Sequence, residues 1–70
     1  MGLNELKVNS LGKICFVKTC NLKRRFMDMG FNRGVNVRPI LVGGSMKVYS
    51  IKGSLIGIRD DDAKNIEVDL

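Results

Sequence analysis

The chain has 70 residues, a formal net charge of +5 and 44% hydrophobic residues, and it contains neither Trp nor His. A chain of this length buries only about 60% of the surface that it exposes when unfolded, so we expect a single domain over residues 1–70. No apolar run approaches the ~20 residues of a membrane-spanning helix, and the first residues lack the apolar region of a secretory signal, so a cytoplasmic location is expected.

The positive charge is concentrated in the first half of the chain. Residues 1–38 contain eight Lys and Arg against two acidic residues, whereas residues 39–70 contain four against five. This asymmetry suggests an acidic partner, a nucleic acid or a membrane surface, although the solvated surface of a basic protein has the same composition.

The first elements expected are a turn and a strand. Residues 3–6 form a single helical turn or a loop with two apolar anchors, and residues 9–12 have the composition of a turn. Residues 13–18 are rich in β-forming side chains, which predicts a strand. Phe16 and Val17 are adjacent apolar residues and break the alternation of that strand, a conflict that a β-bulge would resolve.

A short helix follows this strand, with Thr19 or Asn21 as its N-cap. Leu22, Phe26 and Met29 are spaced i, i+4 and i+7, which places them on one apolar stripe that faces the core.

The other faces of the helix carry charges and one further Met. Arg24 and Asp28 lie opposite the stripe as an i,i+4 pair, a pair that contributes only about 0.2–0.5 kcal/mol. Lys23 and Met27 lie on a third flank, and Gly30 ends the helix as a left-handed residue.

From Gly34 onward the apolar residues recur with period two, which predicts a β-meander. Pro39 cannot donate a hydrogen bond in a ladder, so its strand is either an edge strand or bulged there. The turns and strands that follow are a hairpin turn at residues 43–45, a strand at 46–52, a two-residue turn at Gly53-Ser54 and a strand at 55–59.

The last residues predict one helical turn and a closing strand. Asp60 is expected to cap the turn, and two further Asp residues lie in its first turn, where carboxylates stabilise a helix. The acidic run lacks the glycine and the spacing of a calcium loop, so capping is the better interpretation. Residues 66–70 form the closing strand, with apolar side chains at even positions.

These elements predict a mainly β fold. A few short strands with one helix are unstable as an open sheet, and closing the sheet removes its edges. The expected fold is a small SH3-like barrel of about five strands, with a short helix between strands one and two and a one-turn helix before the last strand. An OB-fold is the competing barrel, but its helix usually falls between the third and fourth strands.

Neither a metal site nor a catalytic pair is evident. Cys15 and Cys20 have no common zinc or redox spacing, and we expect both to be reduced, one in a strand and one in a loop. Ferrous iron is commonly held by His with carboxylates, so no cofactor is expected, although weak or transient association with ferrous iron stays compatible with the sequence. Without His no nucleophile–base pair can be named, so an enzyme is not expected.

Residues 22–34 resemble the helix-and-turn signature of the FeoA family, ferrous iron transport protein A. In that family a basic helix precedes Leu/Met-Gly-Leu and a Pro-Gly that enters a Val-rich strand. The opening at residues 6–14 and the closing segments at 52–59 and 63–68 are similar too, so the resemblance covers nearly the whole chain. Arg33 replaces the usual Pro, and residues 41–45 replace a Pro-Leu-Gly-Asp-Pro turn.

The resemblance implies a non-enzymatic accessory or regulatory protein of bacterial ferrous iron uptake. The implied partner is the membrane transporter FeoB, through its cytosolic GTP-binding domain. The same barrel occurs as the C-terminal domain of iron-dependent repressors of the diphtheria toxin repressor type. The alternative is therefore a small basic barrel that binds nucleic acid or acts as a stand-alone repressor-type interaction domain. Barrels that bind nucleic acid usually present several aromatic side chains, and Tyr49 is the one candidate here, so nucleic acid is not the expected partner.

Two sets of residues are assigned on this basis. Those expected to shape the core and the turns are Leu22, Phe26, Met29, Gly30, Gly34 and Gly53. Those expected to contact a partner are Lys23, Arg24, Met27 and Arg33. Met27 could instead pack against a loop, and an arginine inserted into the GTPase site of a partner is conceivable at Arg24, Arg25 or Arg33.

Overall fold

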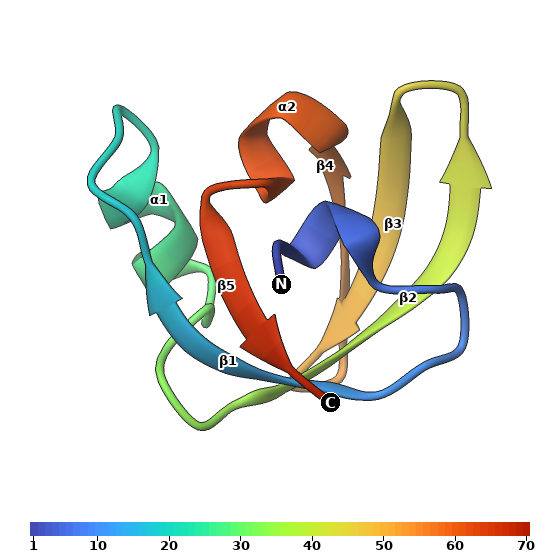
Figure 1. Cartoon of the computed structure of the whole chain (residues 1–70), viewed down its shortest axis with the longest axis horizontal. Helices are drawn as coiled ribbons and strands as arrows, with labels where there is room; N and C mark the ends of the chain where they lie inside the picture. Colours follow the sequence, from blue (N-terminus) through green and yellow to red (C-terminus); the bar gives the residue numbers. More distant parts are fainter.

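A computed structural model describes all residues 1–70, and its strands form one antiparallel sheet in the order β4-β3-β2-β1-β5 (Figure 1). The elements in chain order are η1 (Leu3–Glu5), β1 (Gly12–Val17), α1 (Lys23–Asp28), β2 (Asn36–Gly43), β3 (Met46–Ile51), β4 (Ser54–Arg59), α2 (Asp60–Ala63) and β5 (Ile66–Asp69). The mainly β fold class and the places of the two helices are confirmed. None of the helices has the length and apolarity needed to cross a membrane.

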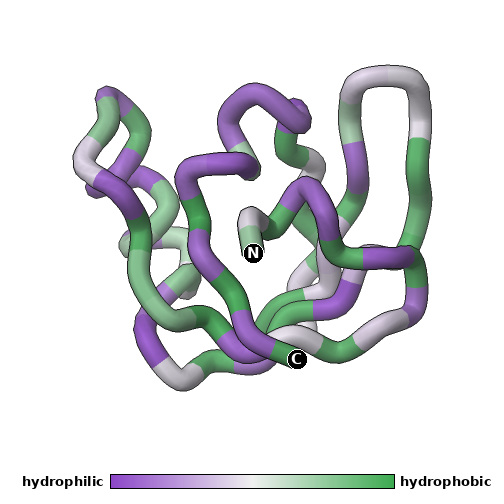
Figure 2. The backbone as a smooth tube through the Cα atoms, viewed as in Figure 1, coloured by the Kyte–Doolittle hydropathy of each residue, from purple (hydrophilic) through white to green (hydrophobic).

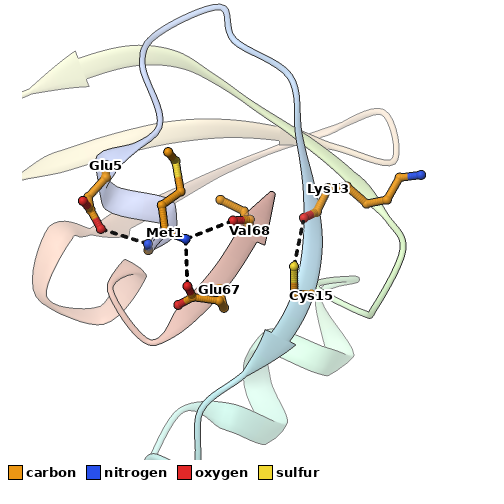
Figure 3. A network of polar contacts seen from close by, with 7 residues as sticks. Met1, Glu5, Lys13, Cys15, Glu67 and Val68 are labelled. Atoms are coloured by element: carbon orange, nitrogen blue, oxygen red, sulfur yellow. Dashed lines mark hydrogen bonds and ion pairs between the residues drawn. The ribbon is translucent and has the colours of Figure 1, made fainter. Parts of the chain in front are cut away.

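The sheet curls but keeps two edges. Its end strands, β4 and β5, do not pair with each other, and α2 connects them. The first residues cover the edge of β5: the Val68 N–H donates to the Met1 carbonyl at 2.8 Å, and Gly2 forms a bridge with Glu67. Figure 3 shows the Met1 amine between the Glu67 carboxylate and the Val68 carbonyl. No comparable bridge lies along β4.

A β-bulge in β1 decides which side chains of this strand reach the core. The register against β5 shifts between Ile14 and Phe16, so Cys15 is the extra residue. Ile14 and Val17 are consequently buried, whereas the Phe16 side chain is 53% exposed. The bulge suggested by the adjacent apolar pair Phe16-Val17 is confirmed.

Pro39 lies in a strand that is bulged and also unpaired on one side, which are the two predicted ways of accommodating it. The register of β2 against β3 shifts between Pro39 and Leu41, which marks a bulge. On its other side β2 pairs with β1 only at Asn36 and Val37, so no β1 partner requires an N–H at Pro39.

The N-terminus of α1 differs from the prediction. Its N-cap residue is Leu22, with no side-chain hydrogen bond, so neither Thr19 nor Asn21 caps the helix. The Lys23 N–H donates instead to the Cys20 carbonyl at 3.2 Å. A backbone turn therefore supplies the acceptor that a capping side chain would have provided.

The C-terminus of α1 follows the prediction. Gly30 has a φ of +105°, its N–H donates to the Met27 carbonyl at 3.1 Å, and the Phe31 N–H donates to the Phe26 carbonyl at 2.9 Å. This pair of bonds is a Schellman motif, which commonly brings together apolar side chains from the two ends of the turn. Here the rings of Phe26 and Phe31 meet edge to face, with centroids 5.8 Å apart.

The apolar stripe of α1 contributes unequally to the core. Phe26 is buried, whereas Leu22 and Met29 are partly buried against the same cluster. The predicted opposite pair, Arg24 and Asp28, is absent from the three ion pairs of the chain.

The two ends of the chain add apolar anchors to this core. Leu3, the first residue of η1, and Leu6, the residue after η1, are buried as the predicted apolar anchors. The alternation of apolar and polar residues along β5 is visible in Figure 2. It buries Ile66 and Val68, whereas β5 ends at Asp69, one residue before the predicted end, and Leu70 beyond it is 81% exposed.

The turn between β3 and β4 lies one residue earlier than predicted. Ile51 pairs with Ser54, so Lys52 and Gly53 are the turn residues and Ser54 begins β4. Lys52 and Gly53 both have positive φ angles, +50° and +78°. Such a turn is of type I′, whose twist matches that of the two flanking strands.

Asp60 does not cap α2, because the N-cap residue is Arg59 and makes no side-chain bond. The Asp60 N–H donates to the Ser45 carbonyl at 2.8 Å, and its carboxylate lies 3.6 Å from the Lys47 amine. The acidic run still occupies the first turn of α2, where its charge favours the positive end of the helix.

Tyr49 belongs to the core, which removes the aromatic side chain considered for base stacking. The side chain is fully buried, and its hydroxyl donates to the Leu3 carbonyl at 3.5 Å. Burial, and secondarily the charge of Asp60, raises the pKa of Tyr49 from 10.0 to about 12. The folded protein therefore keeps the Tyr49 proton at a pH at which the unfolded chain has released it.

The free energy of unfolding should consequently fall as the pH rises from 10.0 to about 12. The expected slope from this one group is about 1.4 kcal/mol per pH unit, because the folded state binds the extra proton. The variant Tyr49→Phe should lose this component, and urea unfolding of both proteins across the range measures the difference. The titration of lysines affects the stability of both proteins equally. Equal slopes of unfolding free energy against pH would therefore contradict the assignment of this component to Tyr49.

Candidate functional site

The residues predicted to contact a partner lie around a groove beside the bulge in β1. The groove has a volume of about 230 Å³ and lies between β1, α1 and the loop that follows α1. We call it the bulge groove. The side chains that define it are Cys15, Phe16, Lys23, Met27, Asn32 and Arg33.

Three of the four predicted contact residues line the bulge groove: Lys23, Met27 and Arg33. Arg24 does not line it, because one residue along an α-helix turns the side chain by about 100°. The Met27 side chain is 46% exposed, which favours a contact surface over packing against a loop.

Phe16 is the residue that reasoning from sequence did not assign to the site. Its exposed ring shares the groove with the exposed side chain of Met27. The adjacent pair Phe16-Val17 was the available signal, since a strand that buries one face can bury only one of two neighbours. That signal predicted the bulge, but which of the two side chains is exposed depends on the register of β1 against β5.

Backbone hydrogen bonds hold the loop after α1 against the bulge. The Gly34 N–H donates to the Ile14 carbonyl at 2.8 Å, and the Ile14 N–H donates to the Val35 carbonyl at 2.9 Å. Gly34 has a φ of +86°, a conformation that favours glycine. The Asn32 side-chain amide donates to the Met27 carbonyl at 3.3 Å. These bonds keep the loop that carries Arg33 beside both α1 and β1.

The lining of the bulge groove is mostly apolar, and its charged residues are all cationic. Lys23 and Arg33 carry its charge, and no acidic residue lines it. Neither cation takes part in an ion pair. Such a surface is complementary to an acidic partner that presents an apolar side chain.

The Cys15 thiol of the bulge groove favours its protonated form. A hydrogen bond with the Asp69 carboxylate, and then burial, raises the pKa of the Cys15 thiol. The thiol also lies 3.9 Å from the Lys13 carbonyl (Figure 3). The protonated form is a poor nucleophile and a poor metal ligand.

The two cysteines are placed as predicted. Both are free, Cys15 in β1 and Cys20 in the bend before α1. No three His, Cys, Asp or Glu side chains gather in an arrangement that could hold a metal ion.

Comparison with known proteins shows which family this chain belongs to. The model of the FeoA domain family matches residues 1–70. The crystal structure of Stenotrophomonas maltophilia FeoA in complex with zinc is 28% identical, with a TM-score of 0.89 over 99% of this chain and 89% of that one. That protein is described as a procaryotic SH3 domain protein with a possible role as a bacterial ferrous iron transport activating factor.

Two structures determined by NMR are similar to the same degree. The FeoA-like protein of Clostridium acetobutylicum is 27% identical, with a TM-score of 0.90 over 100% of this chain and 85% of that one. FeoA of Chlorobium tepidum is 27% identical, with a TM-score of 0.88 over 97% of this chain and 68% of that one. Curated protein sequences gave no match. The SH3-like fold is thereby confirmed, and the chain belongs to the FeoA domain family.

Proposed function

We propose that this chain is a non-enzymatic accessory protein of ferrous iron uptake in the cytoplasm, which docks on the GTP-binding domain of the FeoB transporter through the bulge groove. The observation that carries this proposal is the exposed pair Phe16 and Met27, framed by the unpaired cations Lys23 and Arg33. Membership of the FeoA family supports the link to ferrous iron transport.

The composition of the bulge groove suits protein recognition. Aromatic side chains, Met and Arg are enriched in interfaces, and a few such residues supply most of the binding energy. Phe16 belongs to β1, where it pairs with Glu67 of β5, so its backbone is part of the sheet. We therefore assign Phe16 as the apolar anchor and Lys23 and Arg33 as the residues that steer an acidic partner.

Two other functions receive less support. The raised pKa of the only thiol in the groove keeps it in its weakly nucleophilic form, which argues against covalent catalysis. Phe16 is the one exposed aromatic side chain, because Phe26, Phe31 and Tyr49 are buried. Barrels that bind single-stranded nucleic acid stack successive bases on several aromatic rings.

Charge reversal tests the proposed face. The double variant Lys23→Glu with Arg33→Glu should weaken binding to the GTP-binding domain by about tenfold, because an attraction at the rim becomes a repulsion. The dependence of the affinity on salt should fall or change sign. Calorimetric titrations at low and physiological salt measure both effects.

Two control variants change the same helix outside the groove. Arg24→Glu combined with Asp28→Lys keeps the net charge and controls for altering the surface of α1. Arg24→Glu alone reverses one charge, as each substitution within the groove does. Binding that tolerates the Lys23 and Arg33 reversals but not Arg24→Glu would place the interface on the part of α1 outside the bulge groove. Absence of any binding would contradict the partner assignment itself.

A further inference from the structure

A second groove lies between α1 and the edge strand β4. It has a volume of about 430 Å³. The residues that line it are Leu22, Arg25, Phe26 and Met29 in and beside α1, Gly57, Ile58 and Arg59 in β4, and Met46 and Asp62. We call it the edge groove. It shares no residue with the bulge groove, so the two lie on different flanks of α1.

The backbone of β4 has unused hydrogen-bonding groups on the side away from β3. A two-residue turn begins the ladder with the hydrogen-bonded pair Ile51 and Ser54, so alternate residues from Ser54 onward bond to β3. The N–H and C=O groups of Leu55 and Gly57 therefore point away from β3. None of the backbone bonds outside the regular elements involves either residue.

This edge lacks the features that usually protect an exposed strand. Native proteins protect edges with charges, Pro, bulges or a covering segment. Here β4 carries no Pro, its one charged residue is Arg59 at the end of the strand, and its ladder with β3 has no register shift. Leu55 is 69% exposed. The other edge of the sheet, at β5, is covered by Met1 and Gly2, so β4 is the open edge.

The charges around the edge groove favour an acidic occupant. Arg25 takes part in no ion pair. Arg59 lies 3.6 Å from Asp62, but its side chain is 71% exposed, so that pair leaves the guanidinium accessible. The accessible apolar surface of the edge groove comes from Leu22, Met29 and Met46, because Phe26 and Ile58 are buried beneath it.

We propose that β4 binds an extended segment of a partner protein by strand addition, with the segment lying in the edge groove. The backbone of the segment pairs with the open groups of Leu55 and Gly57. Side chains alternate along a strand, so its apolar residues pack against Met29 and Met46 while acidic residues meet Arg25 and Arg59. The occupant is thus a segment of alternating apolar and acidic residues, and its binding is independent of docking through the bulge groove.

A synthetic peptide tests this proposal on the intact chain. The probe is the acetylated and amidated hexapeptide Asp-Val-Glu-Val-Asp-Val, added to the 15N-labelled protein. The amide signals of Leu55 and Gly57 should shift saturably and exchange with deuterium more slowly, while that of Phe16 stays unchanged. The same peptide with N-methyl groups on alternate amides keeps its charges and side chains but should lose the binding, because it cannot complete the ladder.

Two protein variants separate charge from backbone pairing. Arg25→Glu should weaken binding of the peptide by about fivefold, and Arg24→Glu, on the same helix but outside the groove, by much less.

Equal binding of the N-methylated peptide would overturn strand addition, as would shifts confined to the bulge groove. Shifts at Leu55 and Gly57 that depend on protein concentration alone, with a doubled mass in sedimentation, would assign the edge to a second copy of the chain. None of these outcomes would bear on the proposed docking of the FeoB domain at Phe16.

Discussion

Phe26→Ala is expected to destabilise the protein by about 3–5 kcal/mol, the usual cost of truncating a buried Phe to Ala. Phe26 is 2% exposed, its ring packs edge to face on Phe31, and its carbonyl accepts the bond that closes the Schellman turn. A domain of this size has a total stability of only about 5 kcal/mol, so much of the variant should be unfolded. Urea denaturation followed by circular dichroism measures the effect.

Phe16→Ala is the matched control, since it removes the same ring from an exposed position. We expect it to change stability by less than about 1 kcal/mol, because the ring is 53% exposed and outside the core cluster. Similar losses in the two variants would contradict the assignment of Phe26 to the core and of Phe16 to the surface.

The same Phe16→Ala variant should lose about thirtyfold in affinity for the GTP-binding domain of FeoB. An aromatic anchor at the centre of an interface contributes about 2 kcal/mol or more, which corresponds to that factor. The loss should come mainly from faster dissociation, because the change removes contact area without altering charge. Calorimetry and surface-immobilised kinetics give the two quantities.

Leu55→Ala controls for the removal of exposed apolar surface in general. Leu55 is 69% exposed and does not line the bulge groove, so this variant should bind the GTP-binding domain as the unmodified protein does. Full affinity in Phe16→Ala, or an equal loss in both variants, would exclude Phe16 as the anchor.

The order of strands and helices could be predicted because local signals mark most boundaries. Gly30 ends α1 with a positive φ, and period-two alternation marks the strands of the meander. Turn residues were also informative, although Lys52 joined Gly53 in a turn that we had placed one residue later. That difference arises because a Lys at positive φ is unusual, and the sequence gives no sign of it.

The N-cap of α2 could not be predicted, because a distant backbone group replaces the capping side chain. The Asp60 N–H finds its acceptor at Ser45, on the turn between β2 and β3. The Asp60 carboxylate is instead close to Lys47, whose amine also donates to the Asn4 carbonyl. Both contacts depend on the folded arrangement of η1, β3 and α2, which capping rules do not consider.

The candidate site was predicted in part for a similar reason. Helical spacing was enough to place Lys23 and Met27 together on one flank of α1, and Arg33 joins them through the loop. The exposure of Phe16 depends on the register between β1 and β5, a pairing of the two halves of the chain. A shift of one residue moves a side chain to the other face of a sheet, so local sequence alone could not assign Phe16 to the surface.

The most direct test of the docking surface is chemical-shift mapping of the 15N-labelled protein titrated with the cytosolic GTP-binding domain of FeoB. The account predicts saturable changes centred on Phe16, Lys23, Met27 and Arg33, with little change at Leu55 and Gly57. Saturable binding that leaves the signals of the bulge groove unchanged would contradict it.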